Sequence, residues 1–156
     1  MSVDDGLRPL FRKHIARCHW QSVETGGTGR GIPDSNYCLP PLVEGYGGYE
    51  GWIEYKATKG YEVSLRPEQI GWIMQRGRAG GRVWVAVRRR HQGGLRRGLP
   101  VDELWLIPGG LAMEARTSGL RSDAVQKSAR RWHGGPTAGW DWDAVAALLR
   151  TRSFPD

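Results

Sequence analysis

The stretch GWIEYKAT, residues 51–58, decides the fold, and GIPD at residues 31–34 is its partner upstream. The first stretch predicts a buried strand, in which successive side chains point to opposite faces of a sheet. One face carries Ile53, Tyr55 and Ala57, and the other carries Trp52, Glu54 and Lys56. Burying a charge without a partner costs several kcal/mol. Glu54 and Lys56 therefore need each other, or a further group such as the carboxylate of Asp34.

The chemistry of these three side chains points to a metal site. Two carboxylates that converge repel each other unless a proton or a divalent cation lies between them. Mg²⁺ prefers carboxylate oxygens and keeps several waters. A neighbouring lysine can orient or deprotonate a water, or neutralise a developing oxyanion, so the set suits phosphodiester hydrolysis. The alternative is an ordinary salt bridge between Glu54 and Lys56 on a half-exposed strand, and the apolar residues beside them argue against it.

Composition indicates a basic, globular chain of one domain. The net charge is +7 over 156 residues, which favours polyanions, nucleic acid first and an anionic membrane surface second. No run of 18 apolar residues predicts a membrane span. The N-terminus begins with acids and lacks the apolar segment of a signal peptide, so we expect a cytoplasmic protein. Cys18 and Cys38 form no CxxC pair and are expected to stay reduced.

The order of predicted elements indicates an α/β fold with a small mixed central sheet flanked by helices. Helices are expected over 5–20, over 67–79, near 110–118 and near 142–150. Strands are expected over 32–39, 51–58, 82–89 and 102–107, with a short strand or turn around 61–65. We expect a single domain over 1–156, with a core of about 5–107 and a C-terminal helical extension of about 108–156.

The motifs resemble those of a known nuclease family. PD at 33–34 followed by EYK at 54–56 resembles the PD-(D/E)xK nucleases, which share the restriction-endonuclease-like fold. The stretches ETGGTGRGIPD, GWIEYKAT and LRPEQIGWI are similar to small phage and prokaryotic nucleases, a group with archaeal-type Holliday junction resolvases and stand-alone VRR-NUC nucleases. The resemblance covers about residues 5–90 and implies a restriction-endonuclease-like core that uses Mg²⁺, for which Mn²⁺ would substitute.

The resemblance also implies roles for single residues. The implied catalytic residues are Asp34, Glu54, Lys56 and Gln69. The implied metal ligands are Glu24, Asp34, Glu54 and the backbone carbonyl of Tyr55. Glu24 has two possible roles: it binds the metal directly or through a water, or it is a solvated acid in a loop. Gln69 would face the site from the following helix, or is a polar helix residue. A hydroxyl residue is also expected near the motifs, and three positions stay open: Ser35, Thr58 and Ser64.

Basic residues are expected to bind the phosphates of DNA, which gives salt-sensitive affinity without sequence information. The candidates are Arg30, Arg76, Arg88, Arg89, Arg90, Arg96 and Arg97. Residues 88–90 are alternatively a solvated strand end. The connection that follows them is expected to be mobile, with arginines too crowded to pair with Asp102 and Glu103. The tryptophans at 52, 72 and 84 are expected in the core or at a dimer interface rather than stacked on bases.

The resulting hypothesis is a Mg²⁺-dependent, structure-selective DNA endonuclease, first of all a Holliday junction resolvase. Resolvases of this resemblance act as symmetric dimers on four-way junctions, because two opposed strands must be cut. The alternatives are a flap, nicking or restriction-type nuclease of the same fold, or a non-catalytic DNA-binding module. A glycosidase using Asp34 and Glu54 would leave Lys56 and the net charge of +7 unexplained.

Overall fold

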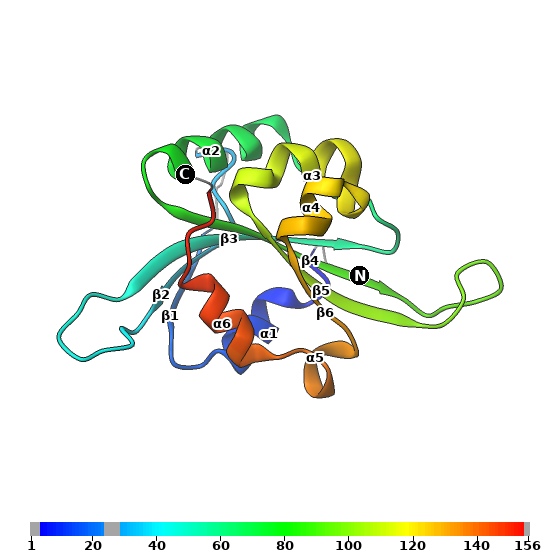
Figure 1. Ribbon diagram of the computed structural model, residues 1–156, viewed down its shortest axis with the longest axis horizontal. Coiled ribbons are helices and arrows are strands. Elements are labelled where there is room, and N and C mark those ends of the chain that lie inside the picture. Colours follow the sequence, from blue (N-terminus) through cyan, green and yellow to red (C-terminus); the bar gives the residue numbers. More distant parts are fainter. Residues whose placement is uncertain (1–3, 24–28, 155–156) are drawn as a thin grey trace.

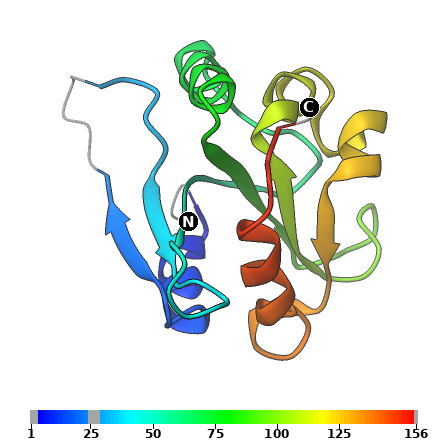
Figure 2. The same cartoon turned by 60° about the vertical axis from the view of Figure 1, so that its left-hand side comes forward.

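Six strands form one mixed sheet in the computed structural model, which describes residues 4–23 and 29–154 (Figure 1). The strands are β1 (His19–Ser22), β2 (Ser35–Leu39), β3 (Tyr49–Thr58), β4 (Arg82–His91), β5 (Val101–Pro108) and β6 (Arg130–Trp132). They lie side by side in chain order. The pair β3–β4 is parallel, and the other neighbours are antiparallel. Figure 2 shows β1 and β6 at opposite edges of the sheet.

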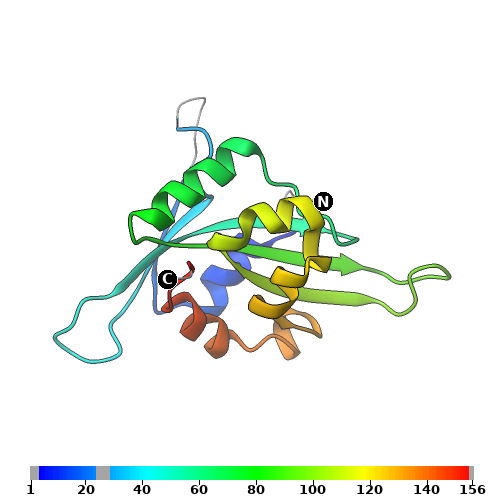
Figure 3. The ribbon, with the colours of Figure 1, turned by 45° about the horizontal axis from the view of Figure 1, so that its top comes forward.

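Helices cover both faces of this sheet. Their bounds are α1 (Leu7–His14), α2 (Pro67–Arg78), α3 (Ala112–Ser118), α4 (Asp123–Ser128), α5 (Gly135–Ala138) and α6 (Trp142–Leu149), with short 3₁₀ turns η1 (Gly109–Leu111) and η2 (Gly119–Arg121). Parallel neighbours need a crossover connection, and α2 supplies it between β3 and β4. Figures 1 and 3 show α2, α3 and α4 on one face of the sheet, and α1 and α6 on the other.

Each face of the sheet buries its own apolar core. Ile53 and Tyr55 pack with α1 and α6, whereas Trp52 packs on the opposite face with α2, so the predicted faces of this strand are confirmed. The strand β4 sends Trp84 to the first core and Val85 to the second. Because β4 is buried on both faces, its sequence is a continuous apolar run rather than an alternation.

The helix predicted over 5–20 is too long, and the short strand or turn predicted around 61–65 is an extended connection. The helix expected over 5–20 ends at His14, because Ile15 leaves the helical region with φ −114° and ψ 67°. The chain then forms β1, in which Trp20 pairs with Tyr37 of β2. No strand forms around 61–65; these residues are an extended connection in which Val63 and Leu65 are buried.

The C-terminal residues belong to the same sheet and cores rather than to an appended helical unit. The expected helices near 110–118 and 142–150 are confirmed as α3 and α6. The strand β6 was not expected, and it pairs with β5 at the edge of the sheet. Trp132 and Val145 pack in the core beneath α1, and Val125 packs in the other core. No helix in the described ranges is both long and apolar enough to cross a bilayer.

Candidate active site

The candidate site lies where β2 and β3 part. Their pairing ends at Ser35 opposite Ile53, while β3 continues to Thr58 alongside β4. Asp34 comes just before β2, and its Oδ2 accepts a hydrogen bond of 2.9 Å from the backbone N–H of Tyr55. The N–H and the C=O of one strand residue point to the same side. The carbonyl of Tyr55 therefore faces the side of β3 on which the Asp34 carboxylate lies.

Glu54 points from β3 toward α2 and is held there by Gln69. The Glu54 side chain is 4% exposed, and its Oε1 accepts a hydrogen bond of 2.7 Å from Gln69 Nε2. The Lys56 Nζ lies 3.4 Å from the same oxygen and donates to Gln69 Oε1 at 3.3 Å. The backbone N–H of Arg66 donates to that amide oxygen at 2.9 Å. Gln69 thus fixes the relative positions of the carboxylate and the ammonium.

The electrostatics of the site favour a proton or a cation at Glu54. Burial raises the pKa of Glu54 to about 7, and the nearby Asp34 carboxylate contributes to this rise, against the opposing effects of Lys56 and Arg66. Asp34 is about one-third exposed, and its Oδ1 lies 3.7 Å from Arg8 Nη2. The site therefore pairs a buried carboxyl with one that solvent reaches.

A glycine places the PD stretch against the start of α2. Gly31 has φ +89°, and a Cβ at this position would collide with the carbonyl oxygen of Glu68 in the first turn of α2. Only glycine allows this backbone conformation and this approach at low cost. Pro33 is buried just before Asp34, and the exposed Arg30 directly precedes Gly31 in the chain.

The available ligands suit Mg²⁺ better than zinc. Within residues 4–23 and 29–154, no three His, Cys, Asp or Glu side chains gather closely enough to hold a metal. The candidate donors are the carboxylates of Asp34 and Glu54 and the carbonyl of Tyr55. Mg²⁺ is commonly bound through one or two carboxylates and keeps several waters, so this oxygen set fits it. The further predicted ligand, Glu24, lies outside the described residues.

The expectation that Arg88 and Arg89 are free for DNA is wrong. Both are buried, and Arg88 donates to both carboxylate oxygens of Asp102 at 2.9 and 2.8 Å. Arg89 lies 3.5 Å from Glu103 and donates to the Gly60 carbonyl at 2.7 Å. The antiparallel register of β4 and β5 brings these acids beside the arginines, so the two arginines stabilise the sheet.

The other residues predicted to bind DNA are exposed, and they lie on different elements of the fold. Arg76 lies over the rings of Trp72 and Trp52, with its guanidinium carbon 4.7 and 5.4 Å from their centroids. The side chain of Arg90 is 45% exposed and lies 3.7 Å from Asp5. Residues 96–97 are exposed in the β4–β5 connection. Trp84 is a core residue, as expected.

The three hydroxyl candidates lie in different surroundings. Ser35 is fully buried, and its Oγ has no hydrogen-bond partner among the described residues. Thr58 is the last residue of β3, and Ser64 is exposed in the connection between β3 and α2. Sequence reasoning assigned neither Arg8 nor Arg66 to the candidate site, because nothing in the spacing relates residue 8 to residue 34, and the resemblance of LRPEQIGWI gave a role only to Gln69.

The arrangement can bind a cation through oxygens and present an ammonium beside it. Asp34 and Glu54 come from separate segments, and the Tyr55 backbone and the Gln69 amide bring them together with Lys56. Such a group can stabilise negative charge on a phosphate and position a water. The interpretation rests on this geometry, because no family model and no curated protein matches the chain.

Proposed function

We propose that the chain is a Mg²⁺-dependent DNA endonuclease of the PD-(D/E)xK type that hydrolyses phosphodiester bonds. The observation that carries the proposal is the convergence of Asp34, Glu54, Lys56 and Gln69 through the hydrogen bonds and the ion pair described for the site. The order α1–β1–β2–β3–α2–β4, with β3 and β4 parallel, supports a restriction-endonuclease-like core. The net charge of +7 supports a polyanionic substrate.

The roles of the residues follow from their positions. Asp34, Glu54 and the carbonyl of Tyr55 would hold Mg²⁺, which when bound supplies Lewis-acid stabilisation of the phosphate charge. Lys56 is placed beside Glu54 to orient or deprotonate the attacking water, or to neutralise the developing oxyanion. Gln69 positions both groups through its amide. Mn²⁺ offers similar oxygen coordination and is expected to replace Mg²⁺.

The substrate we propose is branched DNA, with the four-way junction first, cut by a homodimer. The resemblance of the three motifs to junction resolvases supports this choice, and a two-fold assembly suits paired cuts on opposed strands. Flap, nicking and restriction-type cleavage are the competing activities of the same site. A DNA-binding module without catalysis is the remaining alternative.

The deciding experiment incubates the protein with a labelled four-way junction, a flap, a linear duplex and a single strand, with and without Mg²⁺. We expect Mg²⁺-dependent paired cuts in the junction at enzyme concentrations that leave the duplex intact. Asp34→Asn and Glu54→Gln should abolish cleavage but keep binding in Ca²⁺, because phosphate affinity comes mostly from arginine and lysine. Asp143→Asn, an exposed acid on α6, is the matched control and should cut normally.

Each outcome selects one alternative. Full cleavage by either variant of the acids would remove the site assignment. Faster cleavage of flaps or duplex would remove the resolvase assignment and keep the nuclease. Binding of DNA without cleavage of any substrate in Mg²⁺ or Mn²⁺ would leave the non-catalytic module. Light scattering on the protein alone would test the homodimer.

A further inference from the structure

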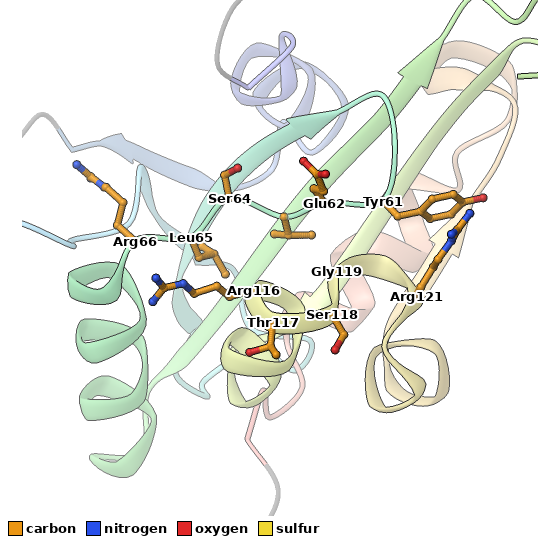
Figure 4. Close-up of a pocket in the computed structure, with 11 residues that line it drawn as sticks. Tyr61, Glu62, Ser64, Leu65, Arg66, Arg116, Thr117, Ser118, Gly119 and Arg121 are labelled. Atoms are coloured by element: carbon orange, nitrogen blue, oxygen red, sulfur yellow. The ribbon is translucent and has the colours of Figure 1, made fainter. Parts of the chain in front are cut away.

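A basic hollow lies beside the candidate active site and has no role in the chemistry proposed for that site. It measures about 700 Å³ and lies between the connection that follows β3 and the end of α3 with η2 (Figure 4). Residues 61–66 form one wall, and residues 116–119 with Arg121 form the other. Neither wall contains Asp34, Glu54, Lys56 or Gln69, and Arg66 is the residue that links the hollow to the candidate site.

Three arginines line this hollow, against one carboxylate. Figure 4 shows Arg66 and Arg121 at its two ends and Arg116 between them. All three are exposed, and among the described residues only Arg66 approaches an acid, with Nε 3.8 Å from Glu68. Glu62 is the carboxylate of the lining. The lining therefore attracts anions, and a guanidinium donates fork-shaped pairs of hydrogen bonds that match phosphate oxygens.

Hydroxyl groups add neutral donors to the arginines. Ser64 on one wall, and Thr117 and Ser118 on the other, are all exposed in the lining. Serine and threonine hydroxyls commonly contact the phosphate and sugar groups of nucleic acids. The combination of guanidinium and hydroxyl donors suits a sugar–phosphate backbone rather than a base or an apolar ligand.

The two walls are fastened to each other, so the hollow is formed before a ligand enters. The backbone N–H of Leu120 donates to the carbonyl of Tyr61 at 2.7 Å. Gly119 has φ +65°, and a Cβ there would collide with that carbonyl oxygen. The Tyr61 ring contacts two guanidiniums, those of Arg89 and Arg121, at 4.2 and 4.0 Å from its centroid. These contacts hold Arg121 at the rim, which reduces the ordering cost of binding.

The hollow adjoins the candidate site through Arg66. The backbone N–H of Arg66 holds the amide of Gln69, while its side chain lines the hollow. The Arg66 charge also lowers the pKa of Glu54, in opposition to burial. Arg66 therefore belongs both to the surroundings of the candidate site and to the lining of the hollow.

We propose that this hollow binds the sugar–phosphate backbone of the nucleic acid strand next to the scissile phosphate, with Arg66, Arg116 and Arg121 as its phosphate ligands. The inference rests on the proposed function, because only that function identifies the bound strand as the one whose phosphate lies at the candidate site. It gives residues 116–121 a substrate-binding role that no sequence motif marks.

The test measures binding of the full chain to a fluorescein-labelled four-way junction and to one of its linear arms, in Ca²⁺, over a series of salt concentrations. The test variant is Arg116→Ala/Arg121→Ala. The matched control is Lys13→Ala/Arg17→Ala, which removes two exposed charges from α1 and the turn after it, on the opposite face of the sheet. A third variant, Arg116→Lys/Arg121→Lys, keeps the charges and changes the packing on Tyr61.

We expect the test variant to bind both probes roughly tenfold more weakly or worse. The slope of log affinity against log salt should become shallower by about 0.9 for each phosphate that the variant no longer neutralises. The control should stay within about twofold of the unmodified protein. The lysine variant should keep the salt slope, because it keeps the charges, but should recover only part of the affinity, because an ammonium lacks the paired hydrogen bonds of a guanidinium.

An equal loss of affinity in the test and control variants would overturn the proposal, because it would show general attraction by the net charge. An unchanged affinity in the test variant would overturn it directly. These readings need no cleavage, so they are separate from the proposed function. A protein that cuts DNA in Mg²⁺ yet binds it equally well without Arg116 and Arg121 would lose only this inference.

Discussion

Replacing Glu54 by Gln should make the protein more stable at alkaline pH, although it removes a candidate catalytic group. Burial raises the pKa of Glu54 from its ordinary 4.5 to about 7. The folded protein therefore keeps a proton between these values that the unfolded chain releases. Stability accordingly falls as pH rises through this window, and above it the charged side chain costs about 3 kcal/mol of unfolding free energy. A glutamine cannot ionise and avoids this cost.

The assay is urea unfolding, followed by tryptophan fluorescence, of the unmodified protein and Glu54→Gln in EDTA. Below pH 4.5 the carboxyl of Glu54 is protonated in both folded and unfolded states. Its ionisation should therefore cause little difference in unfolding free energy between the two proteins. From about pH 4 to about pH 8 the variant should gain about 3 kcal/mol relative to the unmodified protein. Glu114→Gln, an exposed acid on α3, controls for the loss of one carboxylate.

Mg²⁺ should reduce this stability difference at about pH 8, because a cation bound by Glu54 stabilises only the folded state that holds it. The unmodified protein should then gain stability from Mg²⁺, and Glu54→Gln should gain little. A stability difference that stays constant across this pH range would refute the reasoning from burial. An equal gain from Mg²⁺ in both proteins would refute Glu54 as a ligand.

Three further predictions follow from the geometry. Lys56→Ala should lower single-turnover cleavage by about 10²–10³-fold at saturating DNA with unchanged affinity in Ca²⁺; a change within twofold would return Lys56 to an ordinary salt bridge. Arg88→Ala should lower the unfolding free energy in urea by about 3 kcal/mol, because it leaves Asp102 without its buried partner, and a change near zero would show that solvent screens this pair. Arg96→Ala/Arg97→Ala should weaken binding to all DNA shapes and make the salt slope shallower by about 0.9 per phosphate, without affecting turnover at saturating DNA; an unchanged slope would mean that this loop does not touch phosphates.

Local patterns predicted the parts of the fold that depend on neighbours in sequence. The alternation over residues 51–58 predicted which side chains of β3 share a face, and Pro67 predicted the start of α2. The role of Gln69, in contrast, was implied by the resemblance to the nuclease family. The same kind of pattern failed over residues 5–20, since the apolar spacing runs on past Ile15 whereas the chain turns to pair with β2. The spacing of apolar residues carries no information about a partner strand that comes later in the chain.

Side-chain partners that depend on strand register could not be predicted from the sequence. The pairing of Arg88 with Asp102 follows from the alignment of β4 with β5, and spacing along the chain suggested instead that these charges could not meet. The basic hollow has the same origin, because Arg66 and Arg116 are brought together only by the packing of the α2 and α3 segments on one face. Such juxtapositions are properties of the tertiary structure, and no short motif encodes them.

The hydrogen bond from the Arg66 backbone to the Gln69 amide joins the candidate site to the first turn of α2. Helix ends fray, and local opening of this kind costs less than unfolding the whole molecule. When the first turn opens, Gln69 releases both Glu54 and Lys56 while the sheet remains intact. Opening of this single turn would therefore take apart the arrangement of Glu54, Lys56 and Gln69 at a lower free-energy cost than unfolding of the whole molecule.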